Sequence, residues 1–334
     1  MNIYDISKKA GVSIATVSRV LNGNAYVSEK TRNKVLEIIK ENDYTPNAFA
    51  RGLGLKTMKI VGILCADSSD PYAARAIFLI EQALRRNNYD SLLCCTGFDL
   101  QDKQYYMNLL LSKHTDAIIL VGSNFVEADN ESNMYIKDAA KTVPIIIING
   151  ALSGENIFCS LCDDYQAVYD ATKALQNNGR KNILYLYNAK SYSGQKKLSG
   201  YLAAVNLDRN DAMQESYVQY VNGDIAEIRD HLNNLYHNGI PIDAIITSDD
   251  SLAISALKFA QQNQLSVPEE LAVIGYNNSI IAECSDPELS SIDNKLEFVC
   301  NNCVSTLMNV LQGIEAPLKT VFSAELIKRG TTNF

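Results

Sequence analysis

Residues 3–23 read IYDISKKAGVSIATVSRVLNG, and this stretch decides the fold of the amino-terminal part of the chain. Asn2 is a residue type that caps helices, and Gly11 permits the left-handed conformation in which a first short helix can end. Ser13 follows almost at once and can cap a second short helix. Two short helices joined by a glycine-containing turn of about three residues predict a helix-turn-helix.

The second helix, at residues 14–21, has two contrasting faces. Its inner face of Val17, Val20 and Leu21 can pack on the first helix. Its outer face consists of Ile14, Ala15, Ser18 and Arg19. Small residues let a backbone approach DNA, hydroxyls can bond phosphate, and one Arg can hold guanine O6 and N7 together. The outer face therefore favours a helix that reads the major groove.

A third helix follows the cap residue Ser28 and runs from Glu29 to about Asn42. Its apolar residues are expected to complete a three-helix core, and they are Val35, Leu36, Ile38 and Ile39.

Charge sets this head apart from the rest of the chain. Residues 1–59 hold ten Lys/Arg and five Asp/Glu, a balance of +5, so residues 60–334 carry −13 of the total of −8. A basic head on an acidic body indicates a polyanion-binding module joined to a domain with another task.

Length and composition exclude several classes of protein. A chain of 334 residues with 47% apolar residues suits two or three domains with buried cores. No apolar run approaches the roughly 18–20 residues of a membrane span. Met1 is followed by Asn2-Ile3-Tyr4 rather than by a basic, apolar signal segment. We therefore expect a cytoplasmic protein with no membrane partner.

Three stretches of the head carry a family resemblance. IYDISKKAGVSIATVSRVLNG, then VSEKTRNKVLEII, and then Tyr44 with PNAFARGL resemble the DNA-binding head of the lactose/galactose repressor (LacI/GalR) family. The resemblance in length and layout extends over the whole chain. It implies a helix-turn-helix head at residues 1–45, a hinge helix and linker at 46–58, and an effector-binding and dimerisation domain at 59–334.

The resemblance also implies which residues contact double-stranded DNA. The base-reading positions are Ile14, Ala15 and Arg19 in the major groove and Leu53 as a wedge in the minor groove. The positions that hold sugar-phosphate are Tyr4, Ser13, Thr16, Ser18, Asn22, Tyr44 and Asn47. Gly52 and Gly54 weaken a helix as short as the hinge, so we expect this segment to be disordered off DNA and helical on the operator.

Pairing of two heads is expected on physical grounds. One helix-turn-helix rarely has enough base contacts for specificity, and two heads about one DNA turn apart supply them. We therefore expect a homodimer, paired mainly through the body's amino-terminal lobe, on a pseudo-palindromic operator. The sequence ends at Phe334 without the leucine heptads that assemble tetramers in part of the resembling family.

The body alternates short apolar runs with amphipathic, helix-like stretches. The strand-like runs are KIVGILC (59–65), SLLCC (91–95), AIILV (117–121), IIII (145–148), ILYLY (183–187), AIIT (244–247) and LAVIG (271–275). Near-continuous apolar strands between helices predict parallel sheets covered on both faces, an α/β body. This number of strand-helix units is larger than a single sheet usually holds. The pattern therefore predicts two lobes.

The resemblance supplies the topology. It implies two lobes of the type I periplasmic-binding-protein kind, joined by crossings near residues 160, 290 and 320. Lobe one would comprise about 59–160 and 292–318, and lobe two about 161–290 and 320–332. Ligands of open α/β sheets bind beyond the carboxyl ends of the strands, so we expect a small carbohydrate-type effector in the cleft between the lobes.

The effector-contacting positions implied by the resemblance are Tyr72, Asn149, Lys197, Ser248 and Asn277. Lys197 stands where the family usually has Arg, Ser248 where it has Asn, and Asn149 and Asn277 where it has Asp. Arg-carboxylate clamps hold sugar hydroxyls through charge-assisted bonds. Losing two carboxylates while keeping a cation leads to the hypothesis of a sugar acid or sugar phosphate as effector. Two rivals remain: a protein co-repressor, as in the catabolite-control branch, or a Lys197 that is simply solvated.

The sequence contains none of the catalytic or metal-binding motifs considered next. No P-loop, GxSxG or HExxH occurs, and no GxGxxG follows the first strand, so we expect neither an enzyme nor a cofactor. The pairs Cys159/Cys162 and Cys300/Cys303 are too far apart for a zinc ribbon and are interpreted as buried free thiols. A cytoplasmic sugar sensor whose head contacts protein remains the alternative function.

Overall fold

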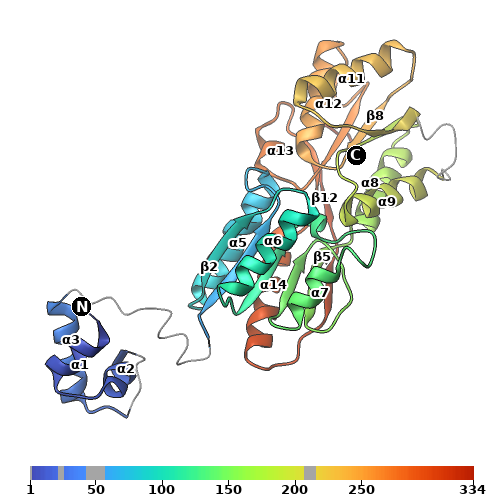
Figure 1. The fold of residues 1–334 in the computed structure, drawn as a ribbon. Coiled ribbons are helices and arrows are strands. Elements are labelled where there is room, and N and C mark those ends of the chain that lie inside the picture. The colour runs from blue at the N-terminus through green and yellow to red at the C-terminus, as the bar shows by residue number, and fades with distance from the viewer. Residues whose placement is uncertain (1, 22–25, 43–56, 207–215) are drawn as a thin grey trace. The chain divides into compact units, whose positions relative to one another are not determined.

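The computed structural model describes residues 2–21, 26–42, 57–206 and 216–334. Contacts divide the chain into two compact units, Met1–Ile60 and Val61–Phe334. The first unit is an all-α head and the second an α/β body (Figure 1). Among the described residues, no helix is both long enough and apolar enough to cross a membrane.

The described residues of the head form α1 (Ile3–Ala10), α2 (Ile14–Leu21) and α3 (Glu29–Glu41). The Asn2 side chain accepts hydrogen bonds from the backbone N–H groups of Tyr4 and Asp5, and Gly11 ends α1 at φ 67°. The Ser28 hydroxyl accepts from Thr31 N at 3.3 Å and caps α3. The helix boundaries therefore follow from the capping residues that the sequence provides.

The core of the head is formed by Ile6, Ala10, Val17, Val20 and Val35, all of them buried. Ile38 and Ile39 pack against it as partly buried residues. Leu36 was expected in this core, but 45% of its surface is exposed. The reason is geometric: on a helix, the residue after a buried Val35 is rotated by about 100° and faces away from the core.

Lobe one is built on a six-stranded sheet in the order β11-β5-β4-β3-β1-β2. Its strands are β1 (Ile60–Cys65), β2 (Asp90–Cys95), β3 (Ala117–Val121), β4 (Ile145–Ile148), β5 (Ile157–Cys162) and β11 (Lys319–Phe322). Its helices are α5 (Pro71–Arg86), α6 (Leu100–Ser112), α7 (Met134–Ala140) and α14 (Leu296–Leu311), with a 3₁₀ turn η1 at Ser123–Phe125. The registers of β1, β3 and β4 are parallel, as the apolar runs predicted, and β5 and β11, which were not among those runs, extend the sheet in the same direction.

Lobe two has a second six-stranded sheet in the order β12-β10-β9-β8-β6-β7. Its strands are β6 (Ile183–Tyr187), β7 (Val218–Tyr220), β8 (Ala244–Thr247), β9 (Ala272–Tyr276), β10 (Ser290–Asp293) and β12 (Glu325–Ile327). Its helices are α8 (Asp164–Asn177), α9 (Tyr192–Val205), α11 (Ile225–His237), α12 (Asp250–Gln262) and α13 (Ile280–Cys284). The edge strand β12 runs antiparallel to β10, so this sheet is mixed rather than wholly parallel.

Helices cover both faces of each sheet (Figure 1). In lobe one, α5 and α14 pack on one face while α6 and α7 pack on the other. Alternate residues of β3 pack into the cores on opposite faces of the sheet. Ile119 faces α5 and α14, whereas Ile118 and Leu120 face α6 and α7. Both faces of these strands are buried, which explains why their sequences are continuously apolar.

The chain crosses between the lobes three times. It leaves lobe one after Cys162, returns after Asp293, and crosses again between Phe322 and Glu325. These points lie a few residues beyond the approximate limits that the sequence suggested.

The four cysteines of the CxxC pairs are free and buried, and burial raises the pKa of the Cys300 thiol to about 12.

Candidate functional site

The outer face of α2 is open to solvent in the head. Ile14, Ala15 and Arg19 are exposed, while Val17 and Val20 on the inner face are buried. A helix-turn-helix reads bases with such an exposed face of its second helix. The arrangement therefore presents one guanidinium, one methyl and one branched apolar side chain on a single surface.

The candidate phosphate contacts of the head are only partly described. Tyr4 is 67% exposed near the start of α1. Ser13 Oγ accepts from Thr16 N at 3.2 Å and lies 2.9 Å from Thr16 Oγ1, so both hydroxyls stabilise the start of α2. Ser18 is half-buried on α2. The remaining candidates, Asn22, Tyr44, Asn47 and Leu53, and nearly all of the hinge segment, lie outside the described residues.

A cavity of about 640 Å³ lies between the two lobes of the body. Its wall in lobe one includes Asp67, Asp70, Tyr72, Phe98, Glu127 and Asn149. Its wall in lobe two includes Asn188, Lys190, Lys197, Tyr220, Ser248, Asp249 and Asn277. Most of these residues directly follow strands or begin the next helix, as expected at the carboxyl ends of parallel strands. All five effector positions implied by the sequence are thus brought to one cleft.

Another cavity of about 650 Å³ lies on lobe two, beside α12 and α13. Its wall is largely apolar and includes Ile254, Leu257 and Ile281. Small-molecule sites combine apolar walls with a few convergent polar groups. The interlobe cleft has such groups in abundance and is therefore the candidate effector site.

Lys197 of α9 is the central cation of the cleft, and it is only 8% exposed. Its Nζ donates to the Ser248 carbonyl at 2.9 Å and lies 3.6 Å from the centroid of the Tyr276 ring. Burial lowers the pKa of Lys197, while the charges of Asp164 and Asp249 oppose that shift. The interpretation of Lys197 as a solvated side chain is therefore wrong.

Asp164 is the buried counterpart of Lys197. Its carboxylate accepts hydrogen bonds from the hydroxyls of Ser193 and Tyr276. Burial raises the pKa of Asp164, and Lys197, Ser193 and Tyr276 oppose that shift. Sequence reasoning missed this residue because nothing in the local pattern distinguishes it from an ordinary helix-start Asp.

Asn149 and Asn277 occupy equivalent places in the two lobes. Each follows a strand with a positive φ, 60° and 97° respectively. Asn149 N donates to Ser160 O at 3.0 Å, and Asn277 N donates to Ile292 O at 2.9 Å. Asn adopts positive φ more readily than most residues. The backbone conformation therefore provides a reason for Asn at both positions that is independent of any ligand.

Ser248 and Asp249 follow β8 and are held by neighbours. Ser248 Oγ donates to Asn188 Oδ1 at 3.2 Å, and Asn188 Nδ2 donates to Asp249 Oδ2 at 2.8 Å. Asp249 Oδ1 also accepts from Leu252 N at 2.9 Å and caps α12. Asp70 similarly caps α5 by accepting from Ala73 N at 2.8 Å. The cleft is thus faced by a capped helix start from each lobe.

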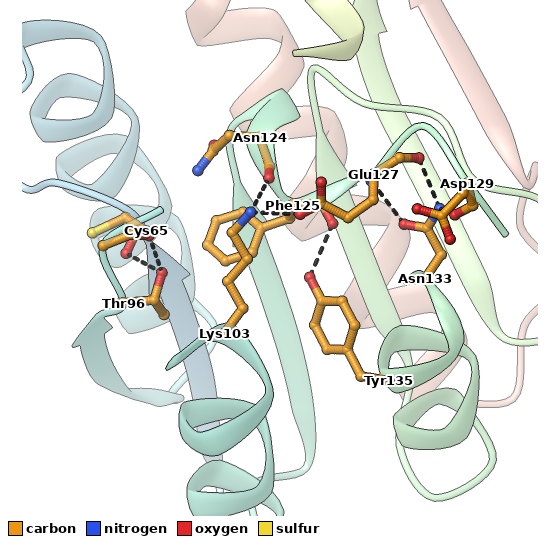
Figure 2. Close-up of polar contacts among 10 residues, drawn as sticks. Cys65, Thr96, Lys103, Asn124, Phe125, Glu127, Asp129, Asn133 and Tyr135 are labelled. Atoms are coloured by element: carbon orange, nitrogen blue, oxygen red, sulfur yellow. Dashed lines mark hydrogen bonds and ion pairs between the residues drawn. The ribbon is translucent and has the colours of Figure 1, made fainter. Parts of the chain in front are cut away.

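A loop of lobe one forms the rim of the cleft through residues 123–128. Figure 2 shows how the buried Lys103 of α6 holds this loop. Lys103 Nζ donates to Asn124 O at 2.6 Å and to Glu127 Oε1 at 2.7 Å. Asn133 bonds both the N–H and the carbonyl of Glu127, each at 2.8 Å. The Tyr135 hydroxyl donates to Phe125 O at 2.9 Å, so the rim is fixed at three points (Figure 2).

The two lobes also touch through this rim. Ser123 Oγ of η1 donates to Ser191 Oγ at 2.8 Å, and Ser191 caps α9 of lobe two. Tyr72 lies in the same cleft, and burial raises its pKa well above the ordinary value. Within the described part of the chain, no group of three or more His, Cys, Asp or Glu could hold a metal ion.

A helix-turn-helix head joined to a two-lobed body with an interlobe cleft defines a ligand-responsive DNA-binding regulator. Residues 2–47 match the family described as "Bacterial regulatory proteins, lacI family". Residues 58–329 match "Periplasmic binding proteins and sugar binding domain of LacI family". The chain belongs to the LacI family of transcriptional regulators, and its body is a sugar-binding domain of that family.

Similar proteins agree with this assignment. The chain is 55% identical over 334 residues to an HTH-type transcriptional regulator of Lachnoclostridium phytofermentans, with full coverage of both chains. It is 29% identical to the sucrose operon repressor of Pediococcus pentosaceus, with 98% of each chain covered. The fold resembles that of the Lac repressor dimer bound to operator and an anti-inducer, with a TM-score of 0.86 at 20% identity, covering 99% of this chain and 98% of that chain.

Proposed function

We propose that this protein represses genes of carbohydrate metabolism by binding, as a cytoplasmic homodimer, to a pseudo-palindromic operator. The observation that carries this proposal is the exposed face of α2, with Ile14, Ala15 and Arg19 directed to solvent over a buried core. Arg19 is the candidate for bidentate contact with guanine, and Ile14 and Ala15 for apolar contact with bases. Leu53 and the hinge segment enter the proposal on the family resemblance alone.

The regulatory half of the proposal concerns the interlobe cleft. A carbohydrate that contacts both walls would stabilise the closed arrangement of the lobes and so change the geometry of the paired heads. Tyr72, Asn149, Lys197, Ser248 and Asn277 are the candidate contacts. Coupling of this kind is reciprocal, so the effector changes operator affinity by the same factor by which the operator changes effector affinity.

Apolar surface on lobe one supports the homodimer. Phe78 of α5 is 48% exposed, and Leu93 on the edge strand β2 is 42% exposed. A sheet edge with unpaired backbone groups and apolar side chains is suited to pairing with another chain. The sucrose operon repressor, a relative of this chain, adds support for a carbohydrate-linked role.

Operator selection from random DNA duplexes tests the proposal. We expect the full-length protein to enrich a palindrome with half-sites about one helical turn apart. Affinity for the enriched duplex should fall steeply as salt rises, because several phosphates are neutralised. A sugar panel should then change that affinity. Failure to enrich a palindrome, or a salt-independent affinity, would contradict the DNA-binding role.

A further inference from the structure

Acidic side chains outnumber basic ones on the walls of the interlobe cleft. The carboxylates of Asp67, Asp70, Glu127 and Asp249 line it, against the ammonium groups of Lys190 and Lys197. Glu127 is already paired with the buried Lys103, which lies behind the rim. The carboxylates that remain come from both lobes, Asp67 and Asp70 from lobe one and Asp249 from lobe two, and the charge of Asp249 acts on Asp70.

The charge of Lys197 is largely compensated by the protein itself. Its ammonium group contacts the Ser248 carbonyl and the Tyr276 ring, and it lies in the field of the buried Asp164. An ammonium group compensated in this way cannot make the cleft positive. The hypothesis of an anionic effector rested on the absence of two carboxylates at Asn149 and Asn277. The structure shows other carboxylates in the same cleft, those of Asp67, Asp70 and Asp249.

Asp70 lies within the electrostatic influence of two other carboxylates, Asp67 and Asp249. Although its side chain is open to solvent, surrounding protein atoms raise the pKa of its carboxyl, and the charges of Asp249 and Asp67 act in the same direction. Negative charges in the cleft therefore already repel one another. A carboxylate or phosphate placed among them would add to this repulsion.

Hydroxyl groups suit these walls better than charged groups. A hydroxyl can donate to a carboxylate and at the same time accept from an ammonium or an amide. Hydrogen bonds of this type to ionised groups are stronger than neutral ones. The cleft offers both kinds of partner, with Asp70 and Asp249 as acceptors and Lys197 as donor.

Two aromatic rings that line the same cavity are far more exposed than Lys197. Phe98 follows β2 after Gly97, which has φ 66°, and 70% of its surface is exposed. Tyr220 ends β7 and is 47% exposed, with Lys190 Nζ 4.7 Å from its ring centroid. One ring comes from each lobe, and both line the cavity. Apolar side chains this exposed leave aromatic surface available for the C–H face of a sugar ring.

We propose that the effector is an uncharged carbohydrate of at least two linked rings, a glycoside or a disaccharide. Its inner ring is held by Asp70, Asp249 and Lys197 through its hydroxyls, and its outer ring stacks on Phe98 and Tyr220. This inference rests on the proposed function, in which the cleft is the effector site, and it specifies the chemical class of the ligand.

Calorimetry with matched sugars on the full-length protein tests the ligand class. The probes are sucrose, maltose and cellobiose, their constituent monosaccharides, glucose 6-phosphate, gluconate and glucosamine. We expect at least one neutral disaccharide to bind more than about tenfold tighter than its constituent monosaccharides. Tighter binding of glucose 6-phosphate, gluconate or glucosamine would overturn the proposal, as would the absence of binding by every disaccharide.

Variants separate the two parts of the site. Phe98→Ala and Tyr220→Ala should each weaken binding of the disaccharide by about tenfold while changing monosaccharide affinity by less than about twofold. Tyr105→Ala is the control, because Tyr105 is an exposed aromatic on α6 outside the cleft and should leave both affinities unchanged. Equal losses for mono- and disaccharide would contradict the stacking role of the outer rings.

Charge is tested by the double variant Asp70→Asn/Asp249→Asn. Asn also caps helices, so α5 and α12 keep their caps. We expect weaker binding of the neutral disaccharide and a relative gain in affinity for gluconate. An unchanged preference between the two ligands would contradict the electrostatic argument.

Operator affinity is measured separately by fluorescence anisotropy. A protein that binds the disaccharide but no operator refutes the proposed function and leaves the ligand class standing, whereas operator binding that responds to a sugar phosphate alone refutes only the ligand class.

Discussion

Lys197 and Tyr276 stack in the body, with the ammonium of Lys197 3.6 Å from the centroid of the Tyr276 ring. The hydroxyl of that same tyrosine donates to the buried carboxylate of Asp164. Three elements of lobe two, α8, α9 and β9, are therefore joined by one buried polar cluster beneath the cleft. A cation over an aromatic face is attractive, and more so when it is shielded from water.

Removing the charge of Lys197 should reveal how much the burial of the Asp164 charge costs in stability. Lys197→Met leaves Asp164 buried without its opposing charge, and we expect a loss of about 3 kcal/mol in the free energy of unfolding. In the double variant Lys197→Met/Asp164→Asn, we expect a loss at least about 1 kcal/mol smaller than the sum of the two single losses. Urea unfolding of all four proteins provides the measurement, and strict additivity would contradict the coupling.

The same pair predicts a pH dependence. Burial raises the pKa of Asp164 above its unfolded value of about 3.9, and removing the Lys197 charge raises it further. The folded state then binds the proton more tightly than the unfolded state, so stability falls as pH rises through the raised pKa. Lys197→Met should therefore cost more stability at pH 8 than at pH 5. An equal cost at the two pH values would contradict this prediction, because it would show that the carboxyl of Asp164 does not titrate between pH 5 and pH 8 in the variant.

Lys103 should matter for both stability and effector binding. It is 3% exposed and holds the rim loop through Asn124 O and Glu127. Lys103→Met should lower the free energy of unfolding by about 3 kcal/mol and also weaken effector affinity, because the loop lines the cleft. Lys113→Met, at an exposed lysine that follows the same helix, is the matched control. If both substitutions have the same small effect, the rim does not depend on Lys103.

Gly200 should resist the substitution that normally strengthens helices. Gly to Ala stabilises an exposed helix by about 1 kcal/mol. At Gly200 the new Cβ would lie 2.2 Å from Tyr165 O, where α9 packs against α8. Gly200→Ala should therefore lower stability by about 2 kcal/mol, measured by chemical unfolding. A stabilised variant would show that the two helices can separate at little cost.

Arg19 should contribute sequence discrimination rather than general affinity. Arg19→Ala should weaken binding to the selected operator by about 1–3 kcal/mol and relax the preference at one base pair of each half-site. Lys40→Ala, at an exposed lysine near the end of α3, serves as the control. Competition anisotropy with single-base operator variants measures both effects. A uniform loss across all duplexes would instead assign Arg19 to a phosphate.

Much of the architecture could be predicted from local sequence. The run IIII at 145–148 coincides with β4, and AIILV at 117–121 coincides with β3, because strands buried on both faces need uninterrupted apolar residues. Leu36 was misplaced because its apolar character outweighed its position on the helix. The antiparallel β12 could not be predicted, since its direction is set by the third crossing between the lobes.

The site was predicted only in part. Asn149 and Asn277, which follow strands, and Lys197 of α9 could be located through the family resemblance. Asp67, Asp70 and Glu127 were missed, although the first two lie between β1 and α5 in the run DSSDPY, where cleft residues are expected. Their importance depends on the charges that face them from the other lobe, and those charges are distant in the chain.

The sequence alone determined the helix-turn-helix head, the α/β body and the family, because capping residues, apolar runs and motif spacing are local properties. Only the tertiary structure decided the electrostatic character of the cleft. Lys103 reaches Glu127 across 24 residues, and Lys197 lies in the field of Asp164 on a neighbouring helix. Charge interactions depend on distance and burial in space, so the residues that neutralise a lysine cannot be identified until the chain has folded.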